Sequence, residues 1–452
     1  MTARRRAPGP AGPARRRGSG LGGADWGAAS RRVLPNGLTV VTAPAPRLHS
    51  AMIALYVRAG SRHEQRETNG VSHLLEHLLF RGSEGWPDTA AMNAAVEAAG
   101  GDLNALTARD HGCYYTPIYP GALATGISIL GDLVRRPLLR DIPLEREIIL
   151  AEILDEVDAR GRDVDPDNLV KRLAFGAHPL GFKIAGTPRT IRSLGEAEVR
   201  RHLARHYTAA NLVLCVAGPV REDRVAALAE EHLGGLPRGR PVREIPPPPW
   251  PSGPSIEVVE HPDAQTEFIL AFPARPEPHP DHPAQLCIRR LLDDGLSSRL
   301  PLEIVERRGL AYSLRAGMDV FADAGMFVVD GACAPAKVGR VIEEVLRVLG
   351  DLVARPVPEE ELRRVQRRHR LLLGFSLDSA AELVGWYGSG EMLGAREGLE
   401  ERCRRLERVT EGEVQRVASA MFARRNLAAV VVGPGARRAR RDVARAARLL
   451  PA

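Results

Sequence analysis

Several residue types that mark particular protein classes are scarce in this chain of 452 residues. Aromatic residues make up 4%, and the five cysteines are scattered without a Cys-x-x-Cys pair. This pattern supports neither a disulfide framework nor a thiolate metal site, and it favours a reducing compartment. No segment approaches the roughly 18 apolar residues that would span a membrane, and no apolar signal segment follows the N-terminal arginines. We therefore expect a cytoplasmic protein without a membrane span.

Lysine is also scarce, since only three of the 63 basic side chains are lysines. The net charge of +7 lies at the two ends of the chain. Residues 1–32 hold eight arginines and one aspartate, and residues 437–448 hold six arginines and one aspartate. The part between is therefore slightly acidic. We expect a disordered basic tail at 1–32, a basic C-terminal tail at 437–452, and no nucleic-acid-binding surface on the globular body.

A proline-rich linker divides the chain. Its length of 452 residues implies two or three domains. Residues 237–255 include a run of four prolines, which neither a helix interior nor a central strand accommodates. We expect an N-terminal domain at 33–236, this linker, and a C-terminal domain at 256–436.

The two halves resemble each other. Asn211-Leu212, five residues and Gly218-Pro219 recur 215 positions later as Asn426-Leu427, five residues and Gly433-Pro434. The apolar runs between these motifs predict buried strands. The pattern in the first half predicts strands at 38–42, 50–57, 103–107 and 112–118 and helices at 70–81, 89–99, 122–134 and 144–157. This mixture predicts an α+β fold of two homologous layered domains, each an antiparallel-rich sheet covered by helices, arranged as a clam shell.

The candidate site lies in Val71–Phe80, which reads V-S-H-L-L-E-H-L-L-F. His73 and His77 are four residues apart, so both imidazoles project from one helix face and can bind one metal ion. Glu76 lies near that face, where a carboxylate can take a proton from a metal-bound water. The alternative is an amphipathic helix with two hydrogen-bonded histidines. The surrounding leucines disfavour it, because buried titratable groups cost free energy unless they are paired or bound.

A catalytic zinc site needs a third protein ligand. Glu145 and Glu152 are seven residues apart, so they share one face of the helix predicted at 144–157. One can ligate while the other holds a ligand imidazole. The spacing alone does not select this pair over Glu147, Asp155 or Glu156.

The inverted motif H-x-x-E-H resembles that of the inverzincins, which include pitrilysin, insulysin and the mitochondrial processing peptidase. The resemblance extends from about Leu34 to Gly433. It is carried further by the segments Asn69-Gly70-Val71-Ser72-His73, Gly101-Asp102-Leu103-Asn104-Ala105-Leu106-Thr107, His206-Tyr207, Ser297-Ser298-Arg299-Leu300 and Gly309-Leu310-Ala311-Tyr312-Ser313.

This resemblance implies the roles of the candidate residues. His73, His77 and Glu152 would bind one zinc ion per chain, Glu76 would be the general base, and Glu145 would hold a ligand imidazole. It further implies that the strand containing Asn104 and Ala105 binds an extended peptide by β-addition, with Tyr312 contacting the substrate. An ordinary structural strand is the alternative for Asn104 and Ala105. The implied activity is that of a zinc metalloendopeptidase acting on short or unfolded polypeptides.

The chain departs from the family at one position. Members with a complete single-chain site carry an arginine seven residues before the tyrosine that corresponds to Tyr312, and here that position is Val305. Since an oxyanion donor contributes about 100- to 1000-fold in rate, we expect a homologous partner subunit to supply the Arg/Tyr pair, in a heterodimer or a homodimer. The alternative is a non-catalytic scaffold subunit of the same fold.

Overall fold

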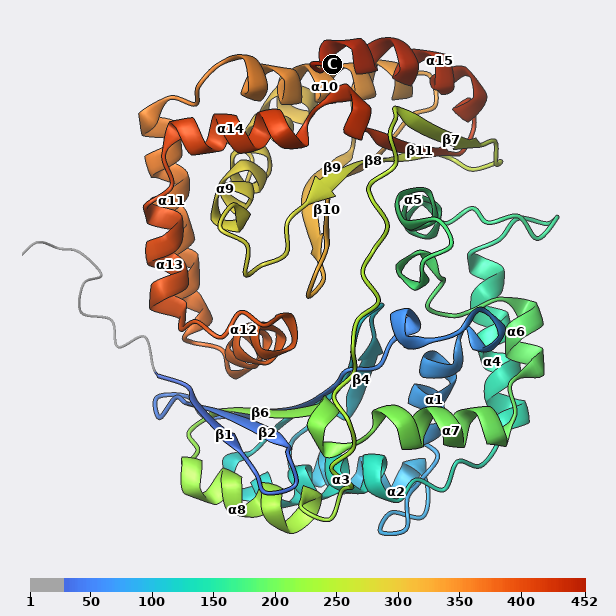
Figure 1. The fold of residues 1–452 in the computed structure, drawn as a ribbon, viewed down its shortest axis with the longest axis vertical. Coiled ribbons are helices and arrows are strands. Elements are labelled where there is room, and N and C mark those ends of the chain that lie inside the picture. Colours follow the sequence, from blue (N-terminus) through green and yellow to red (C-terminus); the bar gives the residue numbers. More distant parts are fainter. Residues whose placement is uncertain (1–27) are drawn as a thin grey trace, which may run out of the picture.

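The computed structural model describes residues 28–452, which form two lobes that each contain one β-sheet (Figure 1). The sheets are separated in the sequence by the proline-rich segment, and helices cover them. Two layered α/β domains were predicted, and this prediction is confirmed.

The first domain contains a six-stranded sheet with the strand order β1-β2-β6-β3-β5-β4. Its strands are β1 (Ser30–Val33), β2 (Thr39–Pro44), β3 (Ala51–Val57), β4 (Asn104–Thr107), β5 (Gly112–Ile118) and β6 (Leu212–Gly218). Its helices are α1 (Val71–Leu79), α2 (Thr89–Ala98), α3 (Leu123–Arg135), α4 (Ile142–Asp155), α5 (Pro166–Phe175), α6 (Pro188–Ser193), α7 (Glu196–His206) and α8 (Glu222–Leu233).

The second domain contains a five-stranded sheet with the order β7-β11-β8-β10-β9. Its strands are β7 (Ser255–Val259), β8 (Thr266–Ala274), β9 (Ser313–Val320), β10 (Gly325–Cys333) and β11 (Ala428–Val432). Its helices are α9 (His282–Leu292), α10 (Val338–Ala354), α11 (Glu359–Ser376), α12 (Ala380–Leu393), α13 (Leu399–Glu407), α14 (Glu411–Met421) and α15 (Ala436–Ala446).

The two sheets share one topology. The order β2-β6-β3-β5-β4 in the first corresponds strand by strand to β7-β11-β8-β10-β9 in the second. In each sheet the first two of these strands pair in parallel and the other neighbours pair antiparallel. The chain is therefore a duplicated unit, with β1 as an added edge strand in the first copy.

The C-terminal segment is not the flexible tail that its charge predicts. Residues 436–446 form α15, whose residues Ala439, Val443 and Ala446 are buried in the core of the second domain. The arginines point outward and the small apolar residues form the buried face, so the high charge concealed an amphipathic helix. The predicted domain end at residue 436 is wrong, because α15 is the counterpart of α8.

The predicted N-terminal tail is shorter than residues 1–32. Residues 30–33 form β1, which pairs antiparallel with β2, and Arg31 makes two 3.0 Å hydrogen bonds to Glu391. The predicted disorder of residues 1–27 lies outside the described residues.

Each sheet is covered on one face by a helix of the other domain. Helix α12 of the second domain packs on β2, β3 and β6, and buries Leu383 and Val384 there (Figure 1). A Cβ at Gly388 would lie 2.2 Å from the ring of Tyr56, so only glycine permits this approach. The first domain and α12 consequently share one apolar cluster.

The reciprocal contact is made by α5 of the first domain. It packs on β7, β8 and β11 of the second sheet and buries Leu169 and Phe175 against residues that include Val430. Lys171 is 2% exposed and pairs with Asp319 of β9. The two domains are therefore interlocked by exchanged helices.

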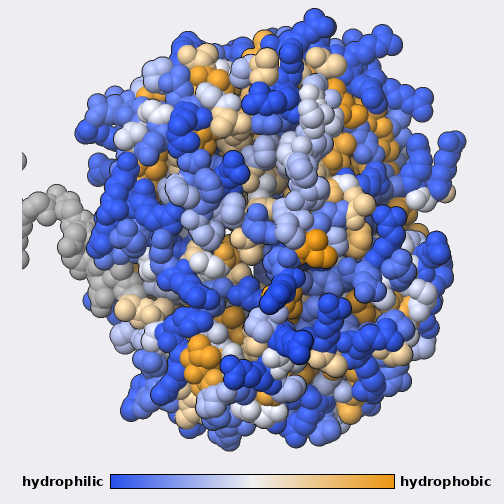
Figure 2. Space-filling view, in the orientation of Figure 1, coloured by the Kyte–Doolittle hydropathy of each residue, from blue (hydrophilic) through white to orange (hydrophobic). Residues whose placement is uncertain are grey.

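The proline-rich segment is attached to both domains. The Trp250 indole Nε1 donates to the Asn426 carbonyl at 2.7 Å, and Arg62 donates to the Ile245 carbonyl at 2.8 Å. The face in Figure 2 is covered mostly by hydrophilic side chains, with apolar ones in small scattered groups. Within residues 28–452, no helix combines the length and apolar character needed to cross a bilayer.

Candidate metal centre

The helix that carries the H-x-x-E-H motif is anchored at its start by a buried carboxylate. Glu64 accepts hydrogen bonds from the backbone N–H groups of Gly70 at 2.7 Å and Ser72 at 2.8 Å, which α1 leaves without helical partners. Gly70 has φ +97°, and a Cβ there would lie 2.6 Å from Ile191. Position and direction of α1 are thereby fixed. Burial raises the pKa of the Glu64 carboxyl, and the hydrogen bonds from Asn69, Ser72 and Gly70 partly offset this rise.

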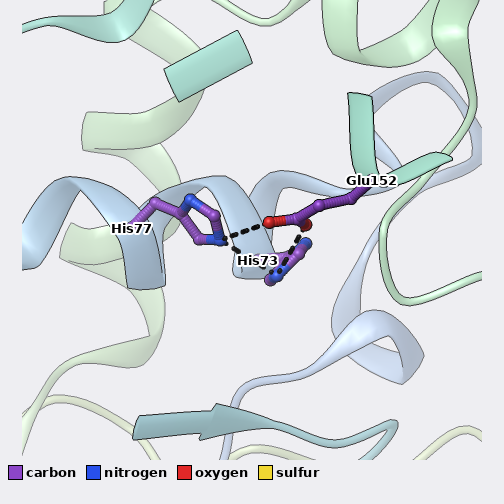
Figure 3. Close-up of side chains that lie close together, drawn as sticks. All are labelled: His73, His77 and Glu152. Atoms are coloured by element: carbon purple, nitrogen blue, oxygen red, sulfur yellow. Dashed lines mark hydrogen bonds and ion pairs between the residues drawn. The ribbon is translucent and has the colours of Figure 1, made fainter. Parts of the chain in front are cut away.

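His73 and His77 project from one face of α1 toward Glu152 of α4 (Figure 3). The two Nε2 atoms are 3.2 Å apart, and each lies 3.8 Å from a carboxylate oxygen of Glu152. Among the described residues these three form a group able to hold a metal ion, with all ligand atoms within 4.8 Å of one another.

This geometry fits a zinc ion. Ligand bonds of about 2.0–2.1 Å in a tetrahedral arrangement place ligand atoms about 3.4 Å apart, and the observed 3.2 and 3.8 Å lie on either side of this value. Burial, and next the charge of His77, lowers the pKa of His73 to about 4, so its imidazole is neutral near pH 7 and can bind a metal. Two imidazoles and one carboxylate are a donor set typical of catalytic zinc.

Glu145 fixes the orientation of one imidazole. Its Oε2 lies 2.9 Å from His77 Nδ1, while its Oε1 accepts from Arg81 Nε. Because Glu145 accepts at Nδ1, the Nε2 atom of His77 keeps its lone pair for a metal. Glu145 is 3% exposed, whereas Glu147 is exposed on another side of α4.

The other acidic residues that the spacing allowed as metal ligands do not face the two histidines. Asp155 is exposed, and Glu156 pairs with Lys183 at 2.7 Å. The arrangement therefore brings Glu152, and no other acidic residue of α4, to the Nε2 atoms of the two histidines, while Glu145 reaches His77 at Nδ1.

Glu76 lies on α1 beside the cluster and accepts a hydrogen bond from Thr107 of β4. Burial raises the pKa of Glu76, and the bond from Thr107 partly offsets this rise. A carboxylate with a raised pKa is suited to accept a proton and return it near neutral pH. Thr107 is a site residue that the sequence did not single out, although it belongs to the segment that carries the resemblance.

The strand β4 forms a free edge of the first sheet next to this site. It pairs with β5 on one side only. The Ala108 N–H donates to His111 at 2.8 Å, and the alternation of an antiparallel ladder then directs the Ala105 N–H and C=O away from β5. Asn104 is exposed and Ala105 is partly buried. This edge can accept an extended peptide as an additional strand.

Comparison with known proteins identifies the family. The family model for insulinase, peptidase family M16, matches residues 39–188, and that for the peptidase M16 inactive domain matches residues 193–368. An uncharacterized zinc protease of Mycobacterium leprae (strain TN) is 33% identical over 422 residues, which cover 89% of this chain and 91% of that protein. The chain belongs to peptidase family M16.

Other similar proteins extend the comparison. The mitochondrial-processing peptidase subunit beta of Blastocladiella emersonii is 30% identical over 414 residues, covering 89% of this chain and 88% of that protein. A protease from Helicobacter pylori has the same fold, with a TM-score of 0.80 at 20% identity over 90% of this chain and 100% of that one. The M16 inactive domain from Pseudomonas fluorescens gives 0.81 at 21% identity, over 90% and 98%. The resemblance stated from the sequence is confirmed.

The second domain does not bring a complete Arg/Tyr pair to the candidate metal site. Tyr312 lies in the loop before β9 and is 87% exposed. Val305 belongs to the π-helix η6 (Pro301–Glu306) and packs on the core of the second domain. The neighbouring Arg307 pairs with Glu303.

Arg308, the other arginine close to Val305, is also engaged. It lies 3.4 Å from Glu344 and 3.9 Å from Glu303. Neither arginine beside Val305 is therefore free to bind a substrate carbonyl without losing an ion pair.

Proposed function

We propose that this M16 chain is a catalytic zinc metalloendopeptidase with one zinc ion, bound by His73, His77 and Glu152. The observation that supports this proposal best is the convergence of these three donors beside the buried Glu76. The names of its relatives, which include zinc proteases, agree with it.

The residues have distinct roles in peptide hydrolysis. A zinc ion at this cluster supplies Lewis acidity toward the scissile carbonyl and acidifies water. Glu76 takes the proton from the attacking water and delivers it to the leaving amine. Thr107 holds the Glu76 carboxylate in place, and Glu145 holds His77. The free edge of β4, at Asn104 and Ala105, binds the backbone of a short or unfolded polypeptide.

A homologous partner subunit completes the active site in this proposal. Val305 replaces the expected arginine, and the two nearby arginines are engaged in ion pairs. The name of one relative, a processing-peptidase subunit beta, describes a subunit of a larger enzyme. The partner would supply an arginine that, together with a tyrosine, stabilises the oxyanion, whether the assembly is a heterodimer or a homodimer.

Hydrolysis of a quenched fluorescent peptide tests this function. The purified chain should contain zinc, lose activity to a chelator and regain it when zinc is restored. Adding the partner should raise the rate about 100- to 1000-fold. Full activity of the chain alone would exclude the partner. A chain that binds no zinc and cleaves no peptide, with or without a partner, would instead be the non-catalytic scaffold.

A further inference from the structure

The duplicated fold places α9 and α11 of the second domain where α1 and α4 lie in the first. Helix α1 follows β3, and α9 follows the corresponding strand β8. Helix α4 carries Pro143 in its first turn, and α11 begins after Pro358, which lies 215 positions later. The two helices of each pair are in contact. In the first domain this helix pair carries the metal donors. In the second domain the equivalent region is dominated by arginine.

A cavity of about 270 Å³ opens between α9, α11 and the loop after α9. Four arginines and two carboxylates line it: Arg290, Arg364, Arg367, Arg368, Asp294 and Glu361. Glu361 is already neutralised, because both its oxygens accept hydrogen bonds from Arg299, at 2.9 and 2.6 Å. The cavity therefore has a surplus of positive charge.

Asp294 holds two of these guanidinium groups together. It lies 3.0 Å from Arg290 Nη1 and 3.2 Å from Arg368 Nε, and its own backbone N–H donates to Ser298 Oγ. The Nε atom of Arg290 is buried without an acceptor among the described residues. Burial lowers the pKa of Arg290, and the neighbouring Asp294 only partly offsets this effect.

The remaining two arginines lie at the mouth of the cavity. Arg364 and Arg367 are exposed and share one face of α11 with Arg368, at positions i, i+3 and i+4. Among residues 28–452, no acidic side chain forms an ion pair with either of them. By contrast Arg363, one residue away but outside the cavity, pairs with Glu359.

We propose that this cavity binds a phosphate-type dianion, either as inorganic phosphate or as a phosphomonoester on a larger molecule. Guanidinium groups match the oxygens of a tetrahedral oxyanion with paired N–H donors. The volume suits a phosphate group with some of its water, and Asp294 holds two of the arginines in position before the ligand arrives. This site is independent of the proposed peptidase activity.

Isothermal titration calorimetry of the full chain with inorganic phosphate, at ionic strength held constant with chloride, tests the proposal. We expect saturable binding at one site. The double variant R364Q/R367Q should bind at least about tenfold more weakly, since each guanidinium contributes a charge-assisted hydrogen bond. The control variant R363Q removes one positive charge from the same helix, outside the cavity, and should bind within about twofold of the parent chain.

A parallel titration with O-phosphoserine separates the two ligand sources. Tighter binding than phosphate identifies an esterified phosphate as the ligand, and weaker binding identifies the free anion. No saturable binding of either compound would overturn the proposal, as would equal affinities for the parent chain and R364Q/R367Q. Thermal melts of all variants check folding, which substitution of these exposed arginines should alter little.

Discussion

Glu145 joins the candidate metal site to the rest of α4 and α1. It holds His77 Nδ1 and Arg81 at once and is almost fully buried. Replacing it by glutamine, E145Q, removes the charge that fixes the imidazole but keeps the size of the side chain. We expect the zinc affinity to fall about 10- to 100-fold, measured by competition with a chromophoric chelator.

A control for this variant is E147Q on the same helix. Glu147 is exposed and points away from the histidines, so its removal should leave zinc affinity unchanged. Equal zinc affinity for E145Q and the parent chain would contradict the role given to Glu145.

Thr107 sets the protonation of Glu76. Burial raises the pKa of Glu76 and the Thr107 hydroxyl lowers it. In T107V the lowering effect of the hydroxyl is lost, so the pKa of Glu76 rises further and Glu76 stays protonated, and inactive as a base, up to a higher pH. The acid limb of the profile of kcat/KM against pH should move upward by about one unit, because a charge-assisted hydrogen bond is lost. A downward shift or an unchanged limb would contradict this account.

The sequence predicted the histidines but not the whole site. His73 and His77 follow from helical periodicity alone, since residues four apart share a face. The family resemblance implied Glu152, but spacing alone did not select it over Glu147, Asp155 or Glu156, because that choice depends on the packing of α4 on α1, which involves residues far apart in the chain. Glu64 belongs to no recognisable motif, because its hydrogen bonds to the start of α1 depend on how the loop before α1 folds.

The edge strand β4 is the element that would position a substrate. A105P removes an N–H that points to the free edge and leaves the bonds to β5 intact, whereas L106P removes a ladder bond. We expect A105P to lower kcat/KM at least about tenfold, while the melting temperature changes little. L106P should lower the melting temperature as well. Unchanged peptide hydrolysis by A105P would exclude binding at this edge.

Helix α15 was wrongly predicted from its charge, although the internal repeat relates it to α8. The offset of 215 that relates Asn211 to Asn426 also relates the start of α8, Glu222, to Arg437 at the start of α15. Charge predicted a tail, and the correspondence with α8 that the repeat implies was not used to predict a helix here. The exchange of α5 and α12 between the domains had no such signal, because periodicity shows which face is apolar but not which partner covers it.

The exchanged helices couple the two domains into one folding unit. Leu383 of α12 is 4% exposed and packs in the cluster on the first sheet. L383A should lower the free energy of unfolding by about 2–5 kcal/mol and shift a single calorimetric transition of the whole molecule. The control L296A, at a leucine that is 69% exposed, should change stability by less than about 0.5 kcal/mol. Two separate transitions, of which only one moves in L383A, would contradict the coupling.

The most direct test of the catalytic assignment is E76Q, assayed under single-turnover conditions with zinc content measured on the same sample. Glutamine retains the size of the side chain and its contact with Thr107, but it cannot accept the proton. We predict unchanged zinc content and a rate of peptide hydrolysis lowered by about 100- to 10,000-fold. Equal hydrolysis rates for E76Q and the parent chain at equal zinc content would contradict the assignment.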